Sequence, residues 1–227
     1  MSSSRREALI LSGAGRYADP WHRFEQTSAR ISQILEADGY KVEIADDVDA
    51  RMGELGDGAA DDLPDLVVFN IGEPHQPDAG AEARGRAGLL AYLDTNRPLL
   101  VMHASSTSLH ALPEWEAIVG GVWVRGTTMH PDFGSADIHV ESGRHPIVDG
   151  LHDFSVLDER YTYLRTDPEL SILATHEHAG EDHPIMWAHD YAGSRVVYDA
   201  LGHDTRSFDS DEHREIIVRA ARWLVKG

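Results

Sequence analysis

The segment "RPLLVMHASSTSL" places three side chains capable of chemistry directly after an apolar run. The run Leu99–Met102 is typical of a buried strand, and His103 follows it at a predicted tight turn, with Ser105 and Ser106 just beyond. Such a turn holds the nucleophile in many α/β enzymes. A serine nucleophile needs a G-x-S-x-G type of turn and a positioned histidine–acid pair, and "HASSTS" lacks both flanking glycines. We therefore expect the serines to cap the following helix rather than to attack a substrate.

Two further loops follow apolar segments earlier in the chain. The glycines of "SGAGRY" could cradle a phosphate, but without the rest of a dinucleotide-binding fingerprint we interpret this segment as a turn. The loop "NIGEPH" offers Glu73 and His75. This loop is equally well interpreted as part of a functional site or as an ordinary solvent-exposed loop.

Further polar candidates are His22, His130 and the motifs "DERY" (158–161) and "GHD" (202–204). "DERY" sets adjacent carboxylates beside an aromatic ring. This combination suits a sugar, because carboxylates accept hydrogen bonds from hydroxyl groups while a ring packs on the pyranose face. Taken alone, the motif is more often an ordinary junction between a loop and a strand. In the second motif, the glycine would let the backbone approach a ligand closely.

These groups must be positioned by a regular framework, and the first half of the chain indicates which one. The segments "EALILSGAG", "KVEIA", "DLVVFN" and "RPLLVMH" are predicted strands, and a polar loop follows "KVEIA". One helix is predicted to begin at Pro20, with Asp19 as its N-cap and with Trp21 and Phe24 on its apolar face. A second helix is predicted over Ala79–Asp94. This alternation predicts an α/β fold with a flavodoxin-like, doubly wound and mostly parallel sheet. Its ligand site would lie at the carboxyl ends of the strands.

The pattern changes past residue 120. Closely spaced strand-like segments predict extra strands in the C-terminal half, namely "GSADIHV", "RYTYL", "LSILATHEH", "HPIMWAHD" and "GSRVVYDAL". The last two are separated by a predicted hairpin turn, and the chain closes with a helix in which Asp209 and Glu212 have capping-box spacing. No linker or repeat interrupts the chain, so we expect a single domain over residues 1–227.

Composition restricts the classes of function. The 227 residues are 41% hydrophobic, which allows a substantial core. A formal net charge of -19 repels nucleic-acid backbones and anionic membrane surfaces, so neither partner is expected. The chain has no cysteine, which excludes disulfides, thiolate zinc sites and a cysteine nucleophile. The apolar run Ala8–Leu11 is too short for a signal sequence and no stretch could span a bilayer, so we expect a cytoplasmic protein.

An ordered set of motifs points to a family. The set "MHAS", "IVGG", "HPIVDGL", "DERY", "GSRVVY" and "LGHD" runs through the chain in this order. With these motifs the sequence resembles the ThuA-like (trehalose utilisation) family, within the class I glutamine amidotransferase-like superfamily of flavodoxin-like folds. The family has histidine where amidotransferases place their catalytic cysteine. The resemblance therefore implies that His103 stands at the nucleophile turn and that the chain has no glutaminase activity, in agreement with the absence of cysteine.

The resemblance also implies a polar pocket. We expect His103, Glu159 and His203 to be catalytic and to converge with His130 at the carboxyl ends of the central strands. His130, His22, Asp158 and Tyr161 are the expected substrate-binding groups, the last three near the rim. His103, His130, His203 and Glu159 are also suitable ligands for a divalent metal such as zinc, although no local H-x-x-x-H signature supports one. A bound metal therefore stays open.

Two functions remain open at this stage. The first, implied by the resemblance, is an enzyme acting on a trehalose-like disaccharide or its 3-keto derivative. An oxidised sugar has an acidic C–H beside its carbonyl, so a histidine or glutamate base could drive isomerisation, elimination or hydrolysis. The second is a non-catalytic sugar-binding or interaction protein that keeps the fold, since fold does not establish function. A small-molecule carbohydrate is the expected partner in the first case, and homo-oligomerisation stays open in both.

Overall fold

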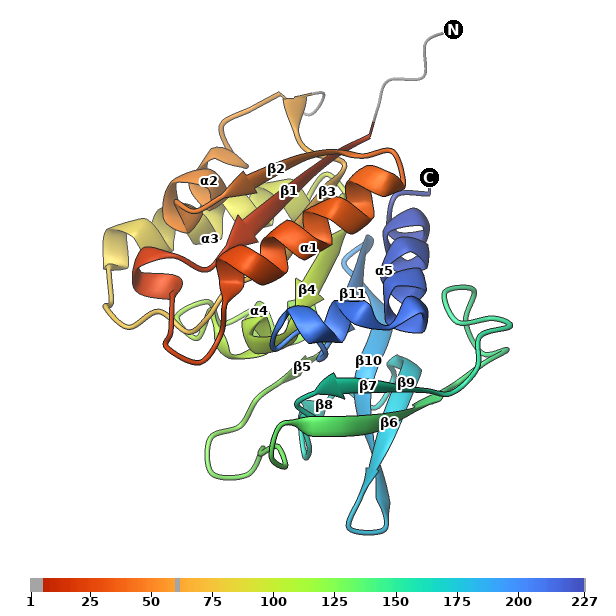
Figure 1. Cartoon of the computed structure of the whole chain (residues 1–227). Coiled ribbons are helices and arrows are strands. Elements are labelled where there is room, and N and C mark those ends of the chain that lie inside the picture. Colours follow the sequence, from red (N-terminus) through yellow and green to blue (C-terminus); the bar gives the residue numbers. More distant parts are fainter. Residues whose placement is uncertain (1–5, 60–61, 227) are drawn as a thin grey trace, which may run out of the picture.

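A nine-stranded sheet forms the framework of the computed structural model, which describes residues 6–59 and 62–226 (Figure 1). The sheet has the strand order β2-β1-β3-β4-β11-β10-β9-β6-β7. Its first five strands pair in parallel, and the rest pair antiparallel. The parallel strands are β1 (Glu7–Ser12), β2 (Lys41–Ala45), β3 (Leu66–Asn70), β4 (Leu99–Met102) and β11 (Ser194–Asp199). This arrangement confirms the predicted flavodoxin-like fold and its neighbouring strands β1, β3 and β4.

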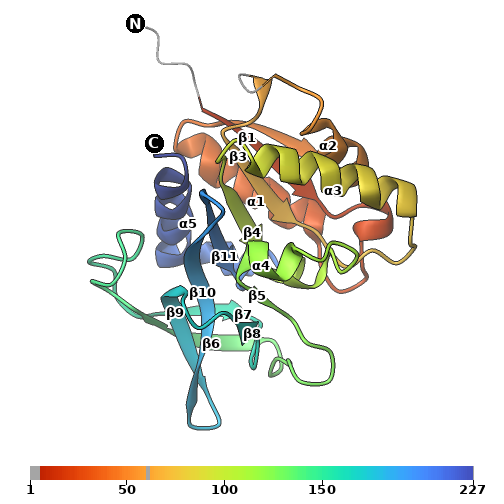
Figure 2. The same ribbon diagram turned by 180° about the vertical axis from the view of Figure 1, so that it is seen from behind.

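Helices cover both faces of the parallel part. Helices α1 (Phe24–Ala37) and α5 (Asp211–Leu224) lie on one face, and α2 (Val48–Glu54) and α3 (Ala79–Leu93) on the other (Figures 1 and 2). The central strand β3 is buried along its whole length. Burial of an aliphatic side chain of this kind contributes about 1.5–3 kcal/mol to folding, so the strand ends are rigid supports for the loops that follow them. Within the described residues, no helix has the length and apolar character needed to cross a membrane.

The C-terminal half extends the sheet with the predicted extra strands. The extension projects away from the helices of the parallel part (Figure 1). A tight turn at Ala192 and Gly193, both with positive φ, joins β10 to β11, as the hairpin prediction required. The extension consists of β6 (Gly134–Val140), β7 (Phe154–Asp158), β9 (Ser171–His178) and β10 (Glu181–Tyr191), beside the small pair β5 (Gly121–Val122) and β8 (Arg165–Thr166) and the helix α4 (Trp115–Val119).

Several local predictions were wrong. Helix α1 begins at Phe24 rather than Pro20, because the Asp19 carboxylate accepts the backbone N–H groups of Trp21 and His22 and so forms a separate turn. Trp21 is consequently 72% exposed and not part of the core. In α5 the cap is Ser210, whose hydroxyl accepts the backbone N–H of His213, and not Asp209.

Two other segments also differ from the sequence pattern. The polar stretch after β2 contains helix α2, which the Asp47 side chain caps and which buries Val48 and Met52. The segment "RYTYL" is not a strand: it makes one isolated bridge, between Met129 and Thr162, before the two-residue strand β8. Short elements of this kind have too few apolar positions to show a period.

Candidate functional site

A cavity of about 850 Å³ opens at the carboxyl ends of β1, β3, β4 and β11, where the antiparallel extension meets the parallel sheet. Loops from both halves of the chain therefore line it. Its polar and aromatic lining is Asp19, Trp21, His22, Glu73, His75, Thr107, Trp123, Arg125, His130, Glu159, Tyr161 and His203. Both groups left open in the "NIGEPH" loop, Glu73 and His75, thus line the cavity.

His103 lies directly after β4 with only 1% of its surface exposed, and it does not itself line the cavity but contacts the lining residues Glu159 and Tyr161. Its φ of 42° is in the left-handed region, which costs a non-glycine residue of order 1–3 kcal/mol and is typical of functional turns. The Nδ1–H of His103 donates to the carbonyl of Ala200 at 2.6 Å. The Nε2 lone pair is therefore directed the other way and accepts the hydroxyl of Tyr161 at 3.0 Å. The two rings also stack, with centroids 4.4 Å apart.

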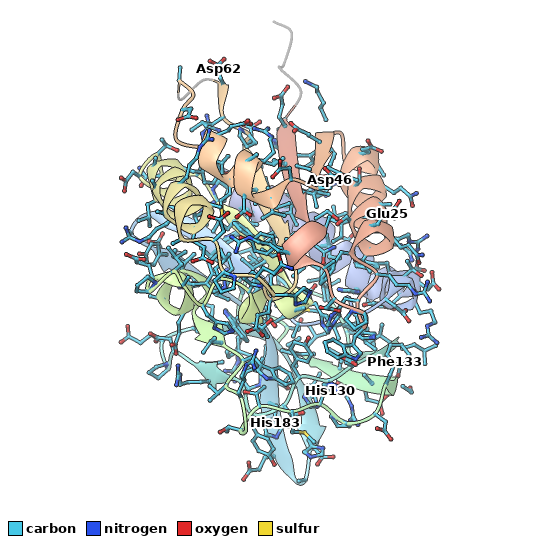
Figure 3. The ribbon with its side chains drawn as sticks, turned by 90° about the vertical axis from the view of Figure 1, so that its left-hand side faces the viewer. Glu25, Asp46, Asp62, His130, Phe133 and His183 are labelled. Atoms are coloured by element: carbon cyan, nitrogen blue, oxygen red, sulfur yellow. The ribbon has the colours of Figure 1, made fainter. Side chains whose placement is uncertain are left out.

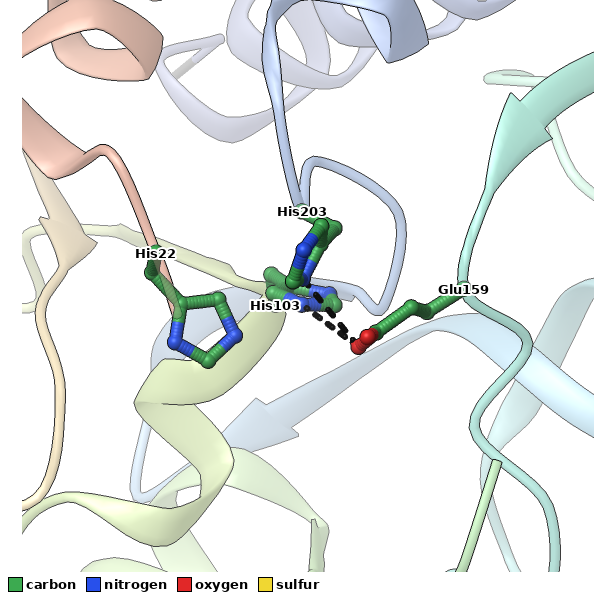
Figure 4. Close-up of side chains that lie close together, drawn as sticks. All are labelled: His22, His103, Glu159 and His203. Atoms are coloured by element: carbon green, nitrogen blue, oxygen red, sulfur yellow. Dashed lines mark ion pairs between the residues drawn. The ribbon is translucent and has the colours of Figure 1, made fainter. Parts of the chain in front are cut away.

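Glu159 is the acidic centre of the cluster shown in Figure 4. Its Oε2 lies 3.2 Å from Nδ1 of His203 and 3.6 Å from Nε2 of His103, and its Oε1 lies 3.6 Å from Nε2 of His130. Burial by itself would raise the pKa of Glu159, but His103 and His203 together hold this pKa well below its usual range. Burial likewise opposes the protonation of His203, yet Glu159 raises the pKa of that ring. The site thus pairs a carboxylate with an imidazole that protonates readily.

Asp158 does not line the cavity, although it was expected at the rim. It is 1% exposed and accepts three backbone N–H groups, those of Glu159 at 2.8 Å, Gly202 at 2.7 Å and His203 at 3.1 Å. Gly202 adopts a φ of 115°, a conformation that favours glycine. Burial raises the pKa of Asp158, while the N–H of Gly202 opposes this rise. Asp158 therefore positions the two residues that carry the cavity's acid and one of its imidazoles.

His22 lies inside the cluster rather than at its rim. Its ring centroid is 5.0 Å from that of His103 and 4.9 Å from that of His203. Its Nδ1 lies 2.7 Å from the carboxylate of Asp19, which can only accept, so this nitrogen carries the proton. Burial lowers the pKa of His22, although Asp19 opposes this effect.

His130 occupies a more open position. It is partly exposed and lies below the helices of the parallel half in Figure 3, above His183 of β10. Ligand atoms of His22, His103, Glu159 and His203 all lie within 4.8 Å of one another, a spacing that could hold a metal ion. The structure therefore brings together three of the four ligands expected from sequence and adds His22, whereas His130 lies outside this set.

The serines of the turn have structural roles, and the capping prediction for them was wrong. Ser105 accepts the backbone N–H of Ile71 and donates to the carbonyl of Phe69. Ser106 accepts the hydroxyl of Tyr198 at 3.1 Å. Both serines are fully buried. Their hydrogen bonds connect the turn after β4 to the end of β3 and to Tyr198 of β11.

Sequence reasoning missed four residues of the site. Trp21 and Trp123 give the cavity aromatic walls, and the Trp123 ring lies 4.7 Å from that of Tyr161. Arg125 forms an ion pair with Glu73. Asp19 was interpreted as a helix cap, whereas it orients His22. The spacing Asp-x-x-His could have indicated this pair, but nothing in the local sequence distinguishes the two tryptophans from core residues.

Comparisons with known proteins agree with this architecture. A family model described as ThuA, trehalose utilisation, matches residues 7–224. A search of curated proteins finds no match. A solved ThuA-like protein from Parabacteroides merdae is similar with a TM-score of 0.78 and 18% identity, over 99% of this chain and 91% of that one. One from Bacteroides uniformis has a TM-score of 0.74 and 18% identity, over 99% and 93%.

The similarity extends to a glutamine amidotransferase from Thermotoga maritima. Its TM-score is 0.59 at 9% identity, over 99% of this chain and 100% of that one. At such identities, structural similarity shows the fold alone. The turn after β4 in this chain carries His103 and no thiol.

Proposed function

The chain belongs to the ThuA (trehalose utilisation) family, and from this premise we propose that it is an enzyme of carbohydrate catabolism. Its substrate is a trehalose-like disaccharide or the 3-keto derivative of one. The observation that supports the proposal most directly is the cluster of His103, Glu159 and His203, in which Glu159 and His203 line the aromatic-walled cavity and the buried His103 lies 3.6 Å from Glu159. The activity does not include glutamine hydrolysis, because no cysteine is available for a thioester.

The cavity suits an uncharged sugar. Its volume of about 850 Å³ lies within the range of small-molecule sites. Trp21 and Trp123 offer flat faces for pyranose rings, while Glu159 and His130 offer hydrogen-bond partners for hydroxyl groups. A net charge of -19 disfavours phosphorylated sugars, nucleic acids and anionic membranes. A cytoplasmic location stays a prediction, and homo-oligomerisation stays open.

The reaction proposed here begins with removal of the acidic proton beside the carbonyl of the oxidised sugar. His103 is the base, because Ala200 holds its Nδ1–H and so leaves Nε2 as the proton acceptor, which takes the substrate proton in place of its hydrogen bond from Tyr161. His203 is the acid, since the Glu159 carboxylate lies 3.2 Å from its Nδ1 and raises the pKa of this ring. Tyr161 stays protonated, because burial raises the pKa of its hydroxyl, and it donates a hydrogen bond. Isomerisation and elimination share this first step, and hydrolysis shares it when water adds to the unsaturated product of the elimination.

Turnover of 3-keto-trehalose by the purified chain tests the proposal. His103→Ala and Glu159→Gln should each lower kcat by roughly a hundredfold or more, the scale of one lost acid–base group. His139→Ala, on an exposed strand face away from the cavity, is the matched control and should keep full activity. Saturable binding of the sugar without turnover would instead support the alternative, a sugar-binding protein that does no chemistry. Turnover unchanged in both site variants would refute the assignment of the residues.

A further inference from the structure

We propose that His22, His103, His203 and Glu159 form a binding site for one divalent transition metal, of which zinc is the best-matched probe. The four side chains come from four separate segments: the turn before α1, the turn after β4, the end of β7 and the loop after β11. The use of such a metal in catalysis rests on the proposed function, and in the metal-bound chain the ion would replace the acid–base roles given above to His103 and His203, because a ring nitrogen bound to a metal neither takes nor gives a proton. The binding itself can be measured without any sugar.

The distances suit a single ion. The four ligand atoms lie within 4.8 Å of one another, and the separations of Glu159 Oε2 from His203 Nδ1 and His103 Nε2 are 3.2 and 3.6 Å. Ligands about 2.0–2.2 Å from a tetrahedral zinc ion lie roughly 3.3–3.6 Å from one another. Binding would thus need only small shifts of side chains that already face a common point (Figure 4).

Two of the four ligand atoms have no other partner. In the part of the chain that the structure describes, the ring nitrogens His22 Nε2 and His203 Nδ1 are buried without a hydrogen bond. His203 Nδ1 is close to Glu159, but the approach lacks hydrogen-bond geometry. An unsatisfied buried polar atom costs about 1–3 kcal/mol, so natural structures rarely keep two side by side. A metal ion at their meeting point satisfies both.

The outer contacts of the rings match those of metal-binding histidines. His22 donates its Nδ1–H to Asp19, and His103 donates its Nδ1–H to the carbonyl of Ala200. Each contact fixes the tautomer and leaves Nε2 as the ligand atom, which is the usual arrangement around bound metals. Asp158 fixes the backbone of the other two ligands, Glu159 and His203. The site is therefore preorganised from outside.

The donor set selects the kind of metal. Three imidazoles and one carboxylate suit zinc and other first-row transition ions, whereas magnesium and calcium prefer oxygen ligands throughout. The Tyr161 hydroxyl now contacts His103 Nε2, so metal binding would replace this hydrogen bond. A bound ion of this kind can polarise a carbonyl oxygen, which is the chemistry that an oxidised sugar requires.

Metal titration of the full chain tests the inference. After treatment with a chelator and dialysis, zinc chloride is titrated calorimetrically and cobalt(II) chloride is titrated by visible absorption. We expect one ion per chain with a Kd below about 1 µM and cobalt bands of a four- or five-coordinate site. Absence of stoichiometric binding of either ion up to about 100 µM would overturn the inference.

Four variants decide which residues are ligands. His22→Ala and Glu159→Gln should each weaken zinc binding by about a hundredfold or more, since loss of a ligand exceeds the effect of an outer contact. His130→Ala and the remote control His139→Ala should leave zinc affinity unchanged, with circular dichroism reporting folding. If His130→Ala weakened binding strongly while His22→Ala did not, the proposed ligand set would be wrong.

The two proposals can fail separately. Stoichiometric zinc binding without turnover of oxidised sugars would refute the proposed function and leave the metal site intact. Turnover by a chain that binds neither ion would refute the metal site alone.

Discussion

The Asp158 carboxylate accepts the backbone N–H of His203 at 3.1 Å. The ring of His203 faces the side chain of Glu159, which follows Asp158 in the sequence. One buried carboxylate therefore sets the position of a second one and of its histidine partner. Because Asp158 also accepts the N–H of Gly202, it holds the whole turn that follows β11. Of the two acids in "DERY", Asp158 thus positions the backbone, whereas Glu159 contacts the histidines of the cluster.

Replacing Asp158 by asparagine tests this division. Asp158→Asn keeps one acceptor oxygen but introduces buried N–H donors, so we expect it to lower the free energy of unfolding by about 1–3 kcal/mol. Because the His203 turn loosens, kcat on an oxidised sugar should also fall by about tenfold or more. The control Asp204→Asn changes a carboxylate on the same loop that pairs with the exposed Arg206 and accepts one backbone N–H, that of Arg206. Equal effects of the two substitutions on stability and turnover would contradict the role of Asp158.

The left-handed backbone at His103 gives a second prediction. His103→Gly and His103→Ala both remove the imidazole, but only glycine adopts a φ of 42° without steric cost. The glycine variant should therefore be more stable than the alanine variant by about 1 kcal/mol in urea unfolding. Neither variant should process an oxidised sugar at a rate near that of the original chain. If His103→Ala were as stable as His103→Gly or more stable, the backbone at this turn would not be strained.

The sequence predicts the sheet well because long buried strands have a strong apolar pattern. Strands β3 and β4 were identified in full, and their carboxyl ends pointed to His103. The start of α1 was misplaced because Asp19 and Pro20 imitate a helix start, whereas the carboxylate forms its own turn. This error hid the approach of His22 to the cluster.

The orientation of side chains at strand ends could not be predicted. Asp158 ends β7, where buried and exposed residues alternate, and the sequence does not reveal which of Asp158 and Glu159 faces a cavity. The position of His130 is set by the loop between β5 and β6, whose course depends on tertiary contacts such as the bridge between Met129 and Thr162. The apolar pattern of the sequence places Trp21 in the core. In the structure it is the most exposed of the large hydrophobic side chains described.

Trp21 provides the third prediction. Its indole lines the cavity while 72% exposed, so it packs against little of the protein and is available to a pyranose ring. Trp21→Ala should raise KM for the sugar by about tenfold, as expected for loss of one aromatic contact, with little change in kcat or melting temperature. Trp21→Phe should keep most of the affinity. A lowered kcat with unchanged KM would place the indole in the chemical step instead.

The buried pair of His213 and Asp199 predicts how stability depends on pH. His213 is fully buried, with Nε2 2.8 Å from the Asp199 carboxylate and Nδ1 near the carbonyl of Ser207. Burial would lower the pKa of His213, but Asp199 raises it above its ordinary value. Since the folded pKa exceeds the unfolded one, this stabilisation is complete below about pH 6.5 and is lost as pH rises through the folded pKa.

Urea unfolding at a series of pH values checks this sign. The free energy of unfolding should decrease above about pH 6.5, and His213→Gln should remove much of that slope. His145 serves as the control, because burial lowers the pKa of this ring. His145→Gln should therefore change the slope only below about pH 6.5, where charging of the original histidine opposes folding. A slope above that pH that His213→Gln leaves intact would exclude the pair as its source.

The last prediction concerns Asp19, which contacts the proposed metal only through His22. Its carboxylate receives the Nδ1–H of His22 at 2.7 Å and so directs Nε2 toward the cluster. Asp19→Asn keeps an acceptor but removes the charge that strengthens the ring as a ligand, and we expect zinc affinity to fall by about tenfold to a hundredfold. Asp19→Ala should lower zinc affinity further, because the turn that positions Trp21 and His22 also loses its hydrogen-bond acceptor. The cobalt(II) spectrum should shift in both variants while His139→Ala leaves it unchanged. Zinc affinities of both Asp19 variants equal to that of His139→Ala would remove His22 from the site, since a ligand held in this way depends on the group that orients it.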